Sequence, residues 1–329
     1  MARGSFPILF ITATNIGDAV LSSGLIKRLA DEIPNARFTI VAGPAAAPLF
    51  SFVPNLDEVI VFAKQKDGSH WFDLWRKVRR RRWGLVVDMR GSAISRLVST
   101  QRRAVHRKLP GEPIHKVMEA AHVLKIEDEP AAPYIWTSPE VEAYADDLTA
   151  GQGPILAMAP AANWVGKTWP LERFSRVAMR LLGSDGPMKG GRLMVLGGAN
   201  ERKVVQGLKD CVPRHRFIDL AGQVDLVTAY ACLKRARLFI GNDSGTMHLA
   251  AASGAPTLGL FGPSDERRYG PWGPNARLVR GARSFEQIMA GEAGSSPVVC
   301  HMMDLSVDRV YEAARALLAE TEPRPHAPS

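Results

Sequence analysis

The sequence predicts an α/β protein made of two doubly wound domains, each built on a parallel sheet. Three observations lead to this fold class. Short runs of large apolar residues alternate with amphipathic helical segments, glycine and proline mark the turns between them, and 329 residues suffice for two domains with well-filled cores. Such alternation favours parallel sheets, because each helix returns the chain to the starting edge of the next strand.

The first half of the chain alternates in this way around a basic helix that carries tryptophan. Apolar strands are expected at residues 8–14, 38–42, 59–62 and 85–88. Helices are expected at 18–32, after Pro48, and at 71–82. Ser138, followed by Pro139, predicts the start of another helix that ends near Gly151.

The second half repeats the pattern more regularly. Strands are expected at 155–159, 193–196, 217–220, 237–241 and 256–262. Helices are expected at 171–182, 201–209, 226–235, 246–253 and 304–320. Residues 151–154, GQGP, have the composition of a linker, so one domain is expected over 1–150 and a second over 151–320. Residues 321–329 contain three prolines and are expected to be disordered.

Composition and missing motifs exclude several classes of protein. The three cysteines, Cys211, Cys232 and Cys300, form no CxxC pair, which argues against a disulfide framework and for a reducing compartment. No apolar run reaches the length of a membrane-spanning helix, so a cytoplasmic protein is expected. GxGxxG after a first strand, GxxxxGK[ST] and an Asp-x-Asp pair are all missing. A dehydrogenase, a P-loop kinase and a metal-clamped nucleotide site are therefore not indicated, and no metal or cofactor is expected.

The stretch 237–264 shows the strongest pattern of a ligand site. A strand ends in the polar turn Asn242-Asp243-Ser244-Gly245, in which Asp243 or Ser244 is expected to cap the following helix. That helix opens on small residues, and its unpaired N–H groups and positive dipole end suit a diphosphate. Ligands of open α/β sheets also bind at the carboxyl ends of strands. An ordinary strand–helix–strand crossover explains the same local pattern equally well.

Cationic side chains follow two other predicted strands. Lys167 lies in the loop after strand 155–159, where it could meet a phosphate or could be a plain surface lysine. Arg90 follows strand 85–88, where it could hold an anionic ligand or could fasten a loop.

Positive charge is concentrated between Lys64 and Lys108. Fourteen lysines and arginines there oppose only Asp67, Asp73 and Asp88, so this stretch is more positive than the whole chain, whose net charge is +9. The pattern favours an anionic partner, such as acidic lipid headgroups or a phosphorylated acceptor. Nucleic acid is disfavoured because no nucleic-acid module accompanies the charge. For the run 79–82 alone, a solvated helix face is the simpler interpretation.

Several segments together resemble the bacterial heptosyltransferases of glycosyltransferase family 9. Three of them are similar to strong family signatures: ILFITATNIGDAVLSSGLIKRL, PAANWVGKTWPLERFSRVA and GNDSGTMHLAAASGAPTLGLFGPSDERRYGPWG. DMRGSAIS and CHMMDLSVDRVYEA are weaker matches, and all five lie in the expected order between residue 8 and about residue 315. The resemblance implies a GT-B architecture, two Rossmann-like domains facing a cleft. The first domain would bind the acceptor and the second the nucleotide-sugar donor, and the last helix could pack back on the first domain.

The resemblance also implies an activity: inverting, metal-independent transfer of a heptose from ADP-heptose to the lipopolysaccharide inner core or a related anionic glycolipid. The implied partners are this nucleotide sugar and glycolipid, with peripheral contact at the inner face of the cytoplasmic membrane and no nucleic acid. A nucleotide-sugar epimerase of the same fold and a non-catalytic glycolipid-binding protein are the alternatives.

Site residues are carried over from the resemblance by position. Asp18 would be the catalytic base, although its place before a predicted helix also fits a helix cap. His248 is expected to be a packed histidine rather than a catalytic one. The acceptor would contact Asn15, Gly17, Arg90 and Ser92. The donor would contact Asn163, Lys167, Asp243, Ser244, Gly245, Thr246 and Met247.

Overall fold

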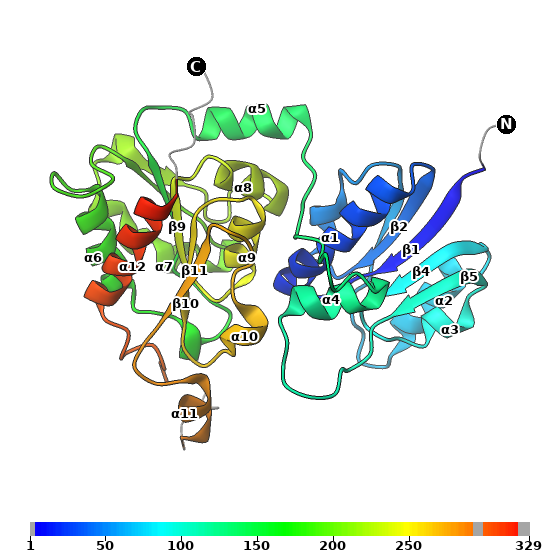
Figure 1. Ribbon diagram of the computed structural model, residues 1–329. Coiled ribbons are helices and arrows are strands. Elements are labelled where there is room, and N and C mark those ends of the chain that lie inside the picture. The colour runs from blue at the N-terminus through cyan, green and yellow to red at the C-terminus, as the bar shows by residue number, and fades with distance from the viewer. Residues whose placement is uncertain (1–3, 292–298, 322–329) are drawn as a thin grey trace. The chain divides into compact units, whose positions relative to one another are not determined.

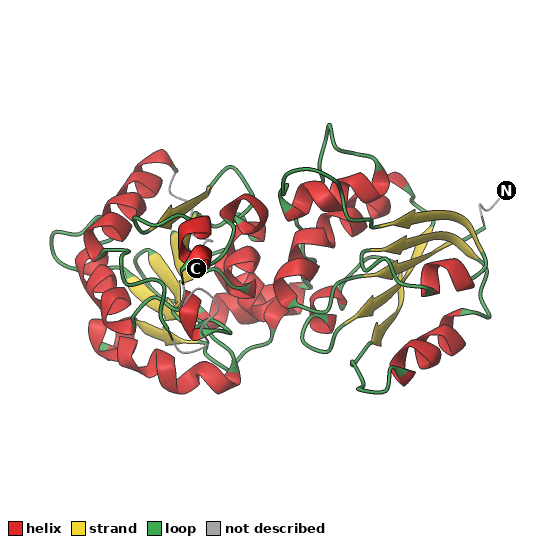
Figure 2. Cartoon of the chain, turned by 90° about the horizontal axis from the view of Figure 1, so that it is seen from below, coloured by secondary structure: helices red, strands yellow, loops and turns green. Residues whose placement is uncertain are grey.

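The computed structural model describes residues 4–291 and 299–321 and divides the chain into two compact units, Met1–Trp136 and Thr137–Ser329. Each unit contains one sheet whose strands all run parallel (Figure 1). Helices flank both sheets (Figure 2). The predicted fold class, two α/β units with parallel sheets, is confirmed.

The first unit has a five-stranded sheet in the order β3-β2-β1-β4-β5. Its strands are β1 (Phe6–Ile11), β2 (Ala36–Ala42), β3 (Leu56–Val61), β4 (Trp83–Asp88) and β5 (Thr100–Val105). In the register of the central strands, Ile11 lies beside both Val41 and Asp88. The carboxyl ends of β1 and β4 are therefore neighbours at one edge of the sheet.

Helices cover both faces of this sheet (Figure 1). They are α1 (Ile16–Glu32), the 3-10 turn η1 (Ala47–Phe50), α2 (Ser69–Val78), α3 (Ile94–Leu97) and α4 (Lys116–Leu124). The side chains of Leu74 and Val78 from α2 and Ile94 from α3 form one core cluster with Leu9 and Ile11 of β1. Helices α1 and α4 pack against each other on the opposite face.

The second unit has a six-stranded sheet in the order β11-β10-β9-β6-β7-β8. Its strands are β6 (Ile155–Ala159), β7 (Arg192–Val195), β8 (Phe217–Asp219), β9 (Leu238–Asn242), β10 (Thr257–Phe261) and β11 (Ala276–Arg280). The helical segments are α5 (Pro139–Leu148), η2 (Val165–Lys167), α6 (Leu171–Leu182), η3 (Ala199–Glu201), α7 (Arg202–Val205), η4 (Gln206–Cys211), η5 (Arg214–Arg216), α8 (Leu226–Leu233), α9 (Gly245–Ala252), α10 (Glu266–Tyr269), α11 (Phe285–Ala290) and α12 (Val307–Glu320). Helices α6 and α12 share a core with one sheet face, and α8 and α9 lie on the other side (Figure 1).

Most predicted elements are present, but several elements of the structure were not predicted and two predicted helices differ in extent. Strand β5 carries mainly exposed polar residues and β11 mixes exposed and buried positions, so neither edge strand forms the apolar run that marks a buried strand. Helix α4 and the short helices α3, α10 and α11 were also not predicted. The basic helix expected at 71–82 ends at Val78, since the following arginines leave the helix before β4 begins. The helix expected at 201–209 is broken into short helical turns.

Helix α5 belongs to the second unit, because the division falls between Trp136 and Thr137 rather than at the glycine-rich stretch. Glu142 of α5 forms ion pairs with Lys234 at 2.6 Å and with Arg235 at 2.9 Å, both at the end of α8. These contacts, made across the fold, cannot be read from the local composition of a linker.

The last helix, α12, packs in the core of the second unit through Val310, Ala314 and Leu317. Thr321, expected to be disordered, is buried, and its Oγ1 accepts a hydrogen bond from Arg237 at 2.9 Å. The rest of the expected tail, 322–329, lies outside the described residues. Within residues 4–291 and 299–321, no helix has the length and apolar character needed to cross a bilayer.

Candidate functional site

Strand β9 and helix α9 meet at a short polar turn in the second unit. Ser244 is the N-cap residue of α9, but its side chain makes no capping hydrogen bond. Its buried Oγ has no hydrogen-bond partner in the part of the chain that the structure describes. The expected side-chain cap is therefore wrong. The N–H groups of Gly245, Thr246 and Met247 also have no acceptor within that part, so this helix end can receive an anion.

Asn242 fastens this turn to the loop that follows β6. Its Oδ1 accepts a hydrogen bond from the Trp169 N–H at 3.0 Å, and its Nδ2 donates to the Pro160 carbonyl at 2.7 Å. The two strands are adjacent in the sheet, where Ala159 pairs with Gly241. Sequence reasoning treated Asn242 only as a turn residue. Its role depends on the pairing of β6 with β9, which the sequence pattern does not give.

The Lys167 ammonium lies 3.1 Å from the Asp243 carboxylate, so the structure brings together two of the predicted donor residues. Both side chains are largely buried, with 20% and 7% of their surface exposed. The Nε2 of His248 lies 3.9 Å from the other oxygen of Asp243. His248 is buried, in agreement with the expectation of a packed histidine.

The loop that carries Lys167 is held by residues 300–305, which lie far from it in the sequence. The Gly166 carbonyl accepts a hydrogen bond from the His301 N–H at 2.9 Å, and the Thr168 carbonyl accepts one from the Cys300 thiol at 3.2 Å. The Trp169 indole donates to the Leu305 carbonyl at 2.9 Å. The segment 300–305 therefore fixes the position of the loop that carries Lys167. Asn163, another predicted donor residue, is exposed and forms no hydrogen bond within the described residues.

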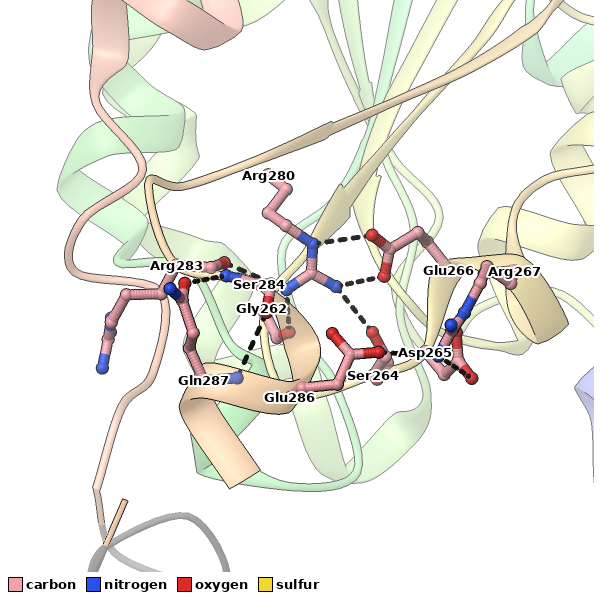
Figure 3. A network of polar contacts seen from close by, with 10 residues as sticks. All are labelled: Gly262, Ser264, Asp265, Glu266, Arg267, Arg280, Arg283, Ser284, Glu286 and Gln287. Carbon is pink, nitrogen blue, oxygen red and sulfur yellow. Dashed lines mark hydrogen bonds and ion pairs between the residues drawn. The ribbon is translucent and has the colours of Figure 1, made fainter. Parts of the chain in front are cut away.

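Arg280, the last residue of β11, holds the loop that follows the neighbouring strand β10 (Figure 3). Its guanidinium donates to the carbonyls of Gly262 and Ser264, both at 2.7 Å, and forms an ion pair with Glu266. The Arg280 side chain is 11% exposed. The loop at the carboxyl end of β10 is thus fixed by an arginine that sequence reasoning did not single out, since strand β11 was itself not predicted.

Asp18 lies in the first unit, in the first turn of α1. The N-cap residue of this helix is Asn15, and no side chain caps it. The Asp18 carboxylate accepts no hydrogen bond among the residues that the structure describes. Its partly exposed carboxylate is therefore not a helix cap and is available to a ligand. Gly17 and Asn15 stand beside it at the start of the same helix.

Asp88 shapes the loop that carries Arg90 and Ser92. The fully buried Asp88 carboxylate accepts hydrogen bonds from the Arg90 N–H at 2.9 Å, the Ser92 N–H at 2.8 Å and the Ser92 hydroxyl at 2.7 Å. Gly91 between them has a φ of +63°, a conformation that favours glycine. Asp88 therefore holds the backbone of this loop. The Arg90 guanidinium takes no part in these hydrogen bonds.

The Arg90 guanidinium lies over two aromatic rings, 4.8 Å from the ring centre of Phe62 and 4.9 Å from that of Trp71. Burial lowers the pKa of Arg90, and the nearby Asp88 opposes this shift. No carboxylate lies within ion-pair distance of Arg90 in the described residues. Because β1 and β4 are neighbours, Arg90 and Ser92 stand at the same sheet edge as Asn15, Gly17 and Asp18. Among the described residues no cluster of three or more His, Cys, Asp or Glu side chains suits a metal ion.

Two units, each with a parallel sheet flanked by helices, fit the GT-B architecture. Solved structures agree with this architecture. The chain is 22% identical to the glycosyltransferase family 9 protein of Veillonella parvula, with a TM-score of 0.79 over 98% of this chain and 99% of that one. It is 20% identical to the ADP-heptose lipopolysaccharide heptosyltransferase II of Escherichia coli, with a TM-score of 0.75 over 96% and 99% of the two chains.

The chain belongs to glycosyltransferase family 9 (heptosyltransferase), whose model matches residues 97–290. It is therefore an enzyme of the glycosyltransferase class. It is also 26% identical to the lipooligosaccharide heptosyltransferase 2 of Haemophilus ducreyi, over 95% of this chain and 99% of that protein. The family resemblance and the GT-B fold inferred from the sequence are confirmed.

Proposed function

We propose that this enzyme transfers a heptose from ADP-heptose to the lipopolysaccharide inner core, or to a related anionic glycolipid, with inversion at the anomeric carbon. Family membership supports the class of reaction. The Haemophilus ducreyi relative acts in lipooligosaccharide synthesis by its name, and the Escherichia coli structure is of an ADP-heptose enzyme. These names support the sugar, the nucleotide and the acceptor class.

The observation that carries the proposal is the meeting of Lys167, Asp243 and the open end of α9. A diphosphate seated on the N–H groups from Ser244 to Met247 would be stabilised by the helix dipole and by the Lys167 ammonium. Once Lys167 contacts phosphate, the Asp243 carboxylate is free to accept hydrogen bonds from sugar hydroxyls. We therefore assign donor binding to the second unit, with Asn163 at the rim of the same loop.

Asp18 is proposed as the catalytic base. Its carboxylate would take the proton from the acceptor hydroxyl while that oxygen attacks the anomeric carbon and ADP departs. The support for this role is an ionisable side chain with no hydrogen-bond donor in the described residues, at the carboxyl edge of the first sheet. A carboxylate that is not engaged elsewhere is free to receive a proton.

The acceptor is proposed to bind the first unit at Asn15, Gly17, Arg90 and Ser92. The Arg90 guanidinium, held by Phe62 and Trp71, would contact an anionic group of the glycolipid. No metal is proposed, so Lys167 and the α9 terminus would carry the charge of the departing ADP. The reaction would take place in the cytoplasm, at the inner face of the cytoplasmic membrane.

The test is a transfer assay with ADP-heptose and a core glycolipid that lacks heptose. Mass spectrometry should show an acceptor enlarged by one heptose, ADP should be released, and NMR should show an inverted anomeric configuration. Donor converted to its epimer without any acceptor would instead support the epimerase alternative. Donor binding with neither transfer nor hydrolysis would support a non-catalytic binding protein.

A further inference from the structure

Helix α2 and the turn that follows it present an outward stripe of aromatic and basic side chains, which we call the α2 surface: Phe72, Trp75 and Arg76 on the helix, Arg79 at its C-cap and Arg80 in the turn. The first four recur at the spacing of one helix face, and Arg80 adjoins it. Phe72 is 61% exposed. Its ring lies 5.7 Å from that of Trp75, and the Arg79 guanidinium lies 4.6 Å from the Trp75 ring centre.

The inner face of α2 is firmly attached to the first unit, so the α2 surface is not a misplaced part of the core. His70, Leu74 and Val78 are buried, and Trp75 packs partly against the core cluster beneath the helix. The helix thus already buries its apolar face. Phe72 is not needed to complete that core, so its ring is available to an apolar environment outside the molecule.

The arginines of the α2 surface are free for an external anion, unlike others in the same basic stretch. Arg79 and Arg80 form no ion pair among the described residues, and Arg76 is only loosely paired with Asp73 at 3.7 Å. By contrast, Arg81 pairs with Asp57 at 2.7 Å, and the Arg103 guanidinium donates to two backbone carbonyls. The charge that the sequence assigns to one stretch is therefore divided by the structure into free and engaged arginines.

We propose that the α2 surface docks the first unit on an anionic lipid bilayer, with Phe72 entering the boundary between headgroups and acyl chains. A bilayer offers phosphate groups to the arginines and an apolar layer to the phenylalanine within one shallow zone. One exposed ring and one half-buried ring provide too little apolar area for a stable protein interface. The proposal rests on the proposed function for the presence of a membrane-bound acceptor, and it adds the element that makes the contact.

The same helix links the bilayer contact to the acceptor residues. Trp71 of α2, which is not part of the α2 surface, packs on Phe62 and lies against the Arg90 guanidinium. A bilayer-bound α2 would therefore hold Arg90 at a fixed depth relative to the headgroups of its lipid acceptor. Binding of α2 to the bilayer would then also place Arg90 beside the headgroup of the lipid acceptor.

The test is vesicle flotation with the full chain and no sugar substrate, using phosphatidylglycerol–phosphatidylethanolamine vesicles. Phe72→Ser should lower the partition coefficient on the order of tenfold, and Phe72→Leu should restore it. Arg79→Gln should lower it about fivefold, an effect that fades as salt rises. Phosphatidylcholine vesicles should bind weakly. The assay measures vesicle binding and not transfer. Its result therefore does not depend on whether the proposed transfer reaction is correct.

Helix α6 supplies a control, because Arg176 and Met179 are a basic and an apolar residue that are both exposed on one helix, and Met179 is 49% exposed. Arg176→Gln/Met179→Ser should leave vesicle binding unchanged. A Phe72→Ser variant that binds like the wild type would overturn the proposal, as would equal loss in the α6 variant. Binding to RNA but not to vesicles, or a Phe72-dependent dimer in sedimentation without vesicle binding, would also overturn it.

Discussion

Lys167 is held in place by a carboxylate of the neighbouring strand end. Its ammonium lies against Asp243 in a largely buried pair, which restricts the lysine side chain and the loop that carries it. A lysine already held in place loses less conformational entropy when a phosphate binds. At this scale the sequence indicated a cation at a strand end, and the structure added the partner that positions it.

Lys167→Met should weaken ADP binding roughly tenfold to a hundredfold, because a charge-assisted hydrogen bond to phosphate is lost. Methionine keeps most of the side-chain volume, and isothermal titration calorimetry gives the dissociation constant. Lys203→Met is the matched control, since Lys203 is exposed on α7 and its side chain forms no ion pair or hydrogen bond within the described residues. Equal affinity in the wild type and Lys167→Met would remove Lys167 from the nucleotide site.

Asp18→Asn separates a base from a structural aspartate. The carboxylate caps no helix, so the free energy of unfolding of the variant should lie within about 0.5 kcal/mol of the wild-type value. Transfer should fall by at least ~10²–10⁴-fold, while the dissociation constant for ADP stays near that of the wild type. Asp31→Asn, in an exposed pair at the far end of the same helix, is the control. Transfer within tenfold of wild type in Asp18→Asn would rule out the base.

At the scale of elements, ion pairs of Glu142 help to attach helix α5 to the end of α8. Burial raises the pKa of Glu142, but hydrogen bonds from Lys234, Thr137 and Arg235 outweigh this and bring it down to about 2. A depressed pKa in the folded state means that the carboxylate stabilises the fold when ionised. That stabilisation is complete above the pKa of about 4.5 in the unfolded chain and disappears as pH falls through about 2.

Glu142→Gln should therefore destabilise the protein by about 1–2 kcal/mol at neutral pH, after allowance for partial solvent exposure. The difference from the wild type should shrink as pH is lowered from about 6 to about 3. Urea denaturation at several pH values measures it, with Asp147→Asn, an exposed residue of the same helix, as the control. A difference that stays constant over this range would show that Glu142 does not hold α5 as an ionised group.

Over the whole molecule, the charge of the proposed leaving group, ADP, would have to be neutralised by protein groups or by a metal ion. Lys167 and the α9 terminus provide positive charge where the diphosphate is proposed to lie, so transfer should persist in EDTA with less than a threefold change. Transfer measured with EDTA, and again after magnesium is restored, decides this. Activity abolished by EDTA and recovered with magnesium would contradict metal-independent transfer.

The sequence by itself determined the fold class, most strands and helices, the family, and the strand ends at which the candidate site residues lie. Apolar periodicity and turn residues are local features, and the residues that carry the family resemblance can be read directly from the chain. The edge strands β5 and β11 were missed because exposed strands need no apolar pattern.

Only the tertiary structure decided which side chains meet. Asn242 fastens two loops, the segment 300–305 holds the Lys167 loop, and Asp88 frees Arg90 to lie on Phe62 and Trp71. It also divided the basic stretch into engaged arginines and the free ones of the α2 surface. Each of these outcomes depends on contacts between residues far apart in the chain. Strand pairing and helix packing fix such contacts, and local sequence patterns do not encode them.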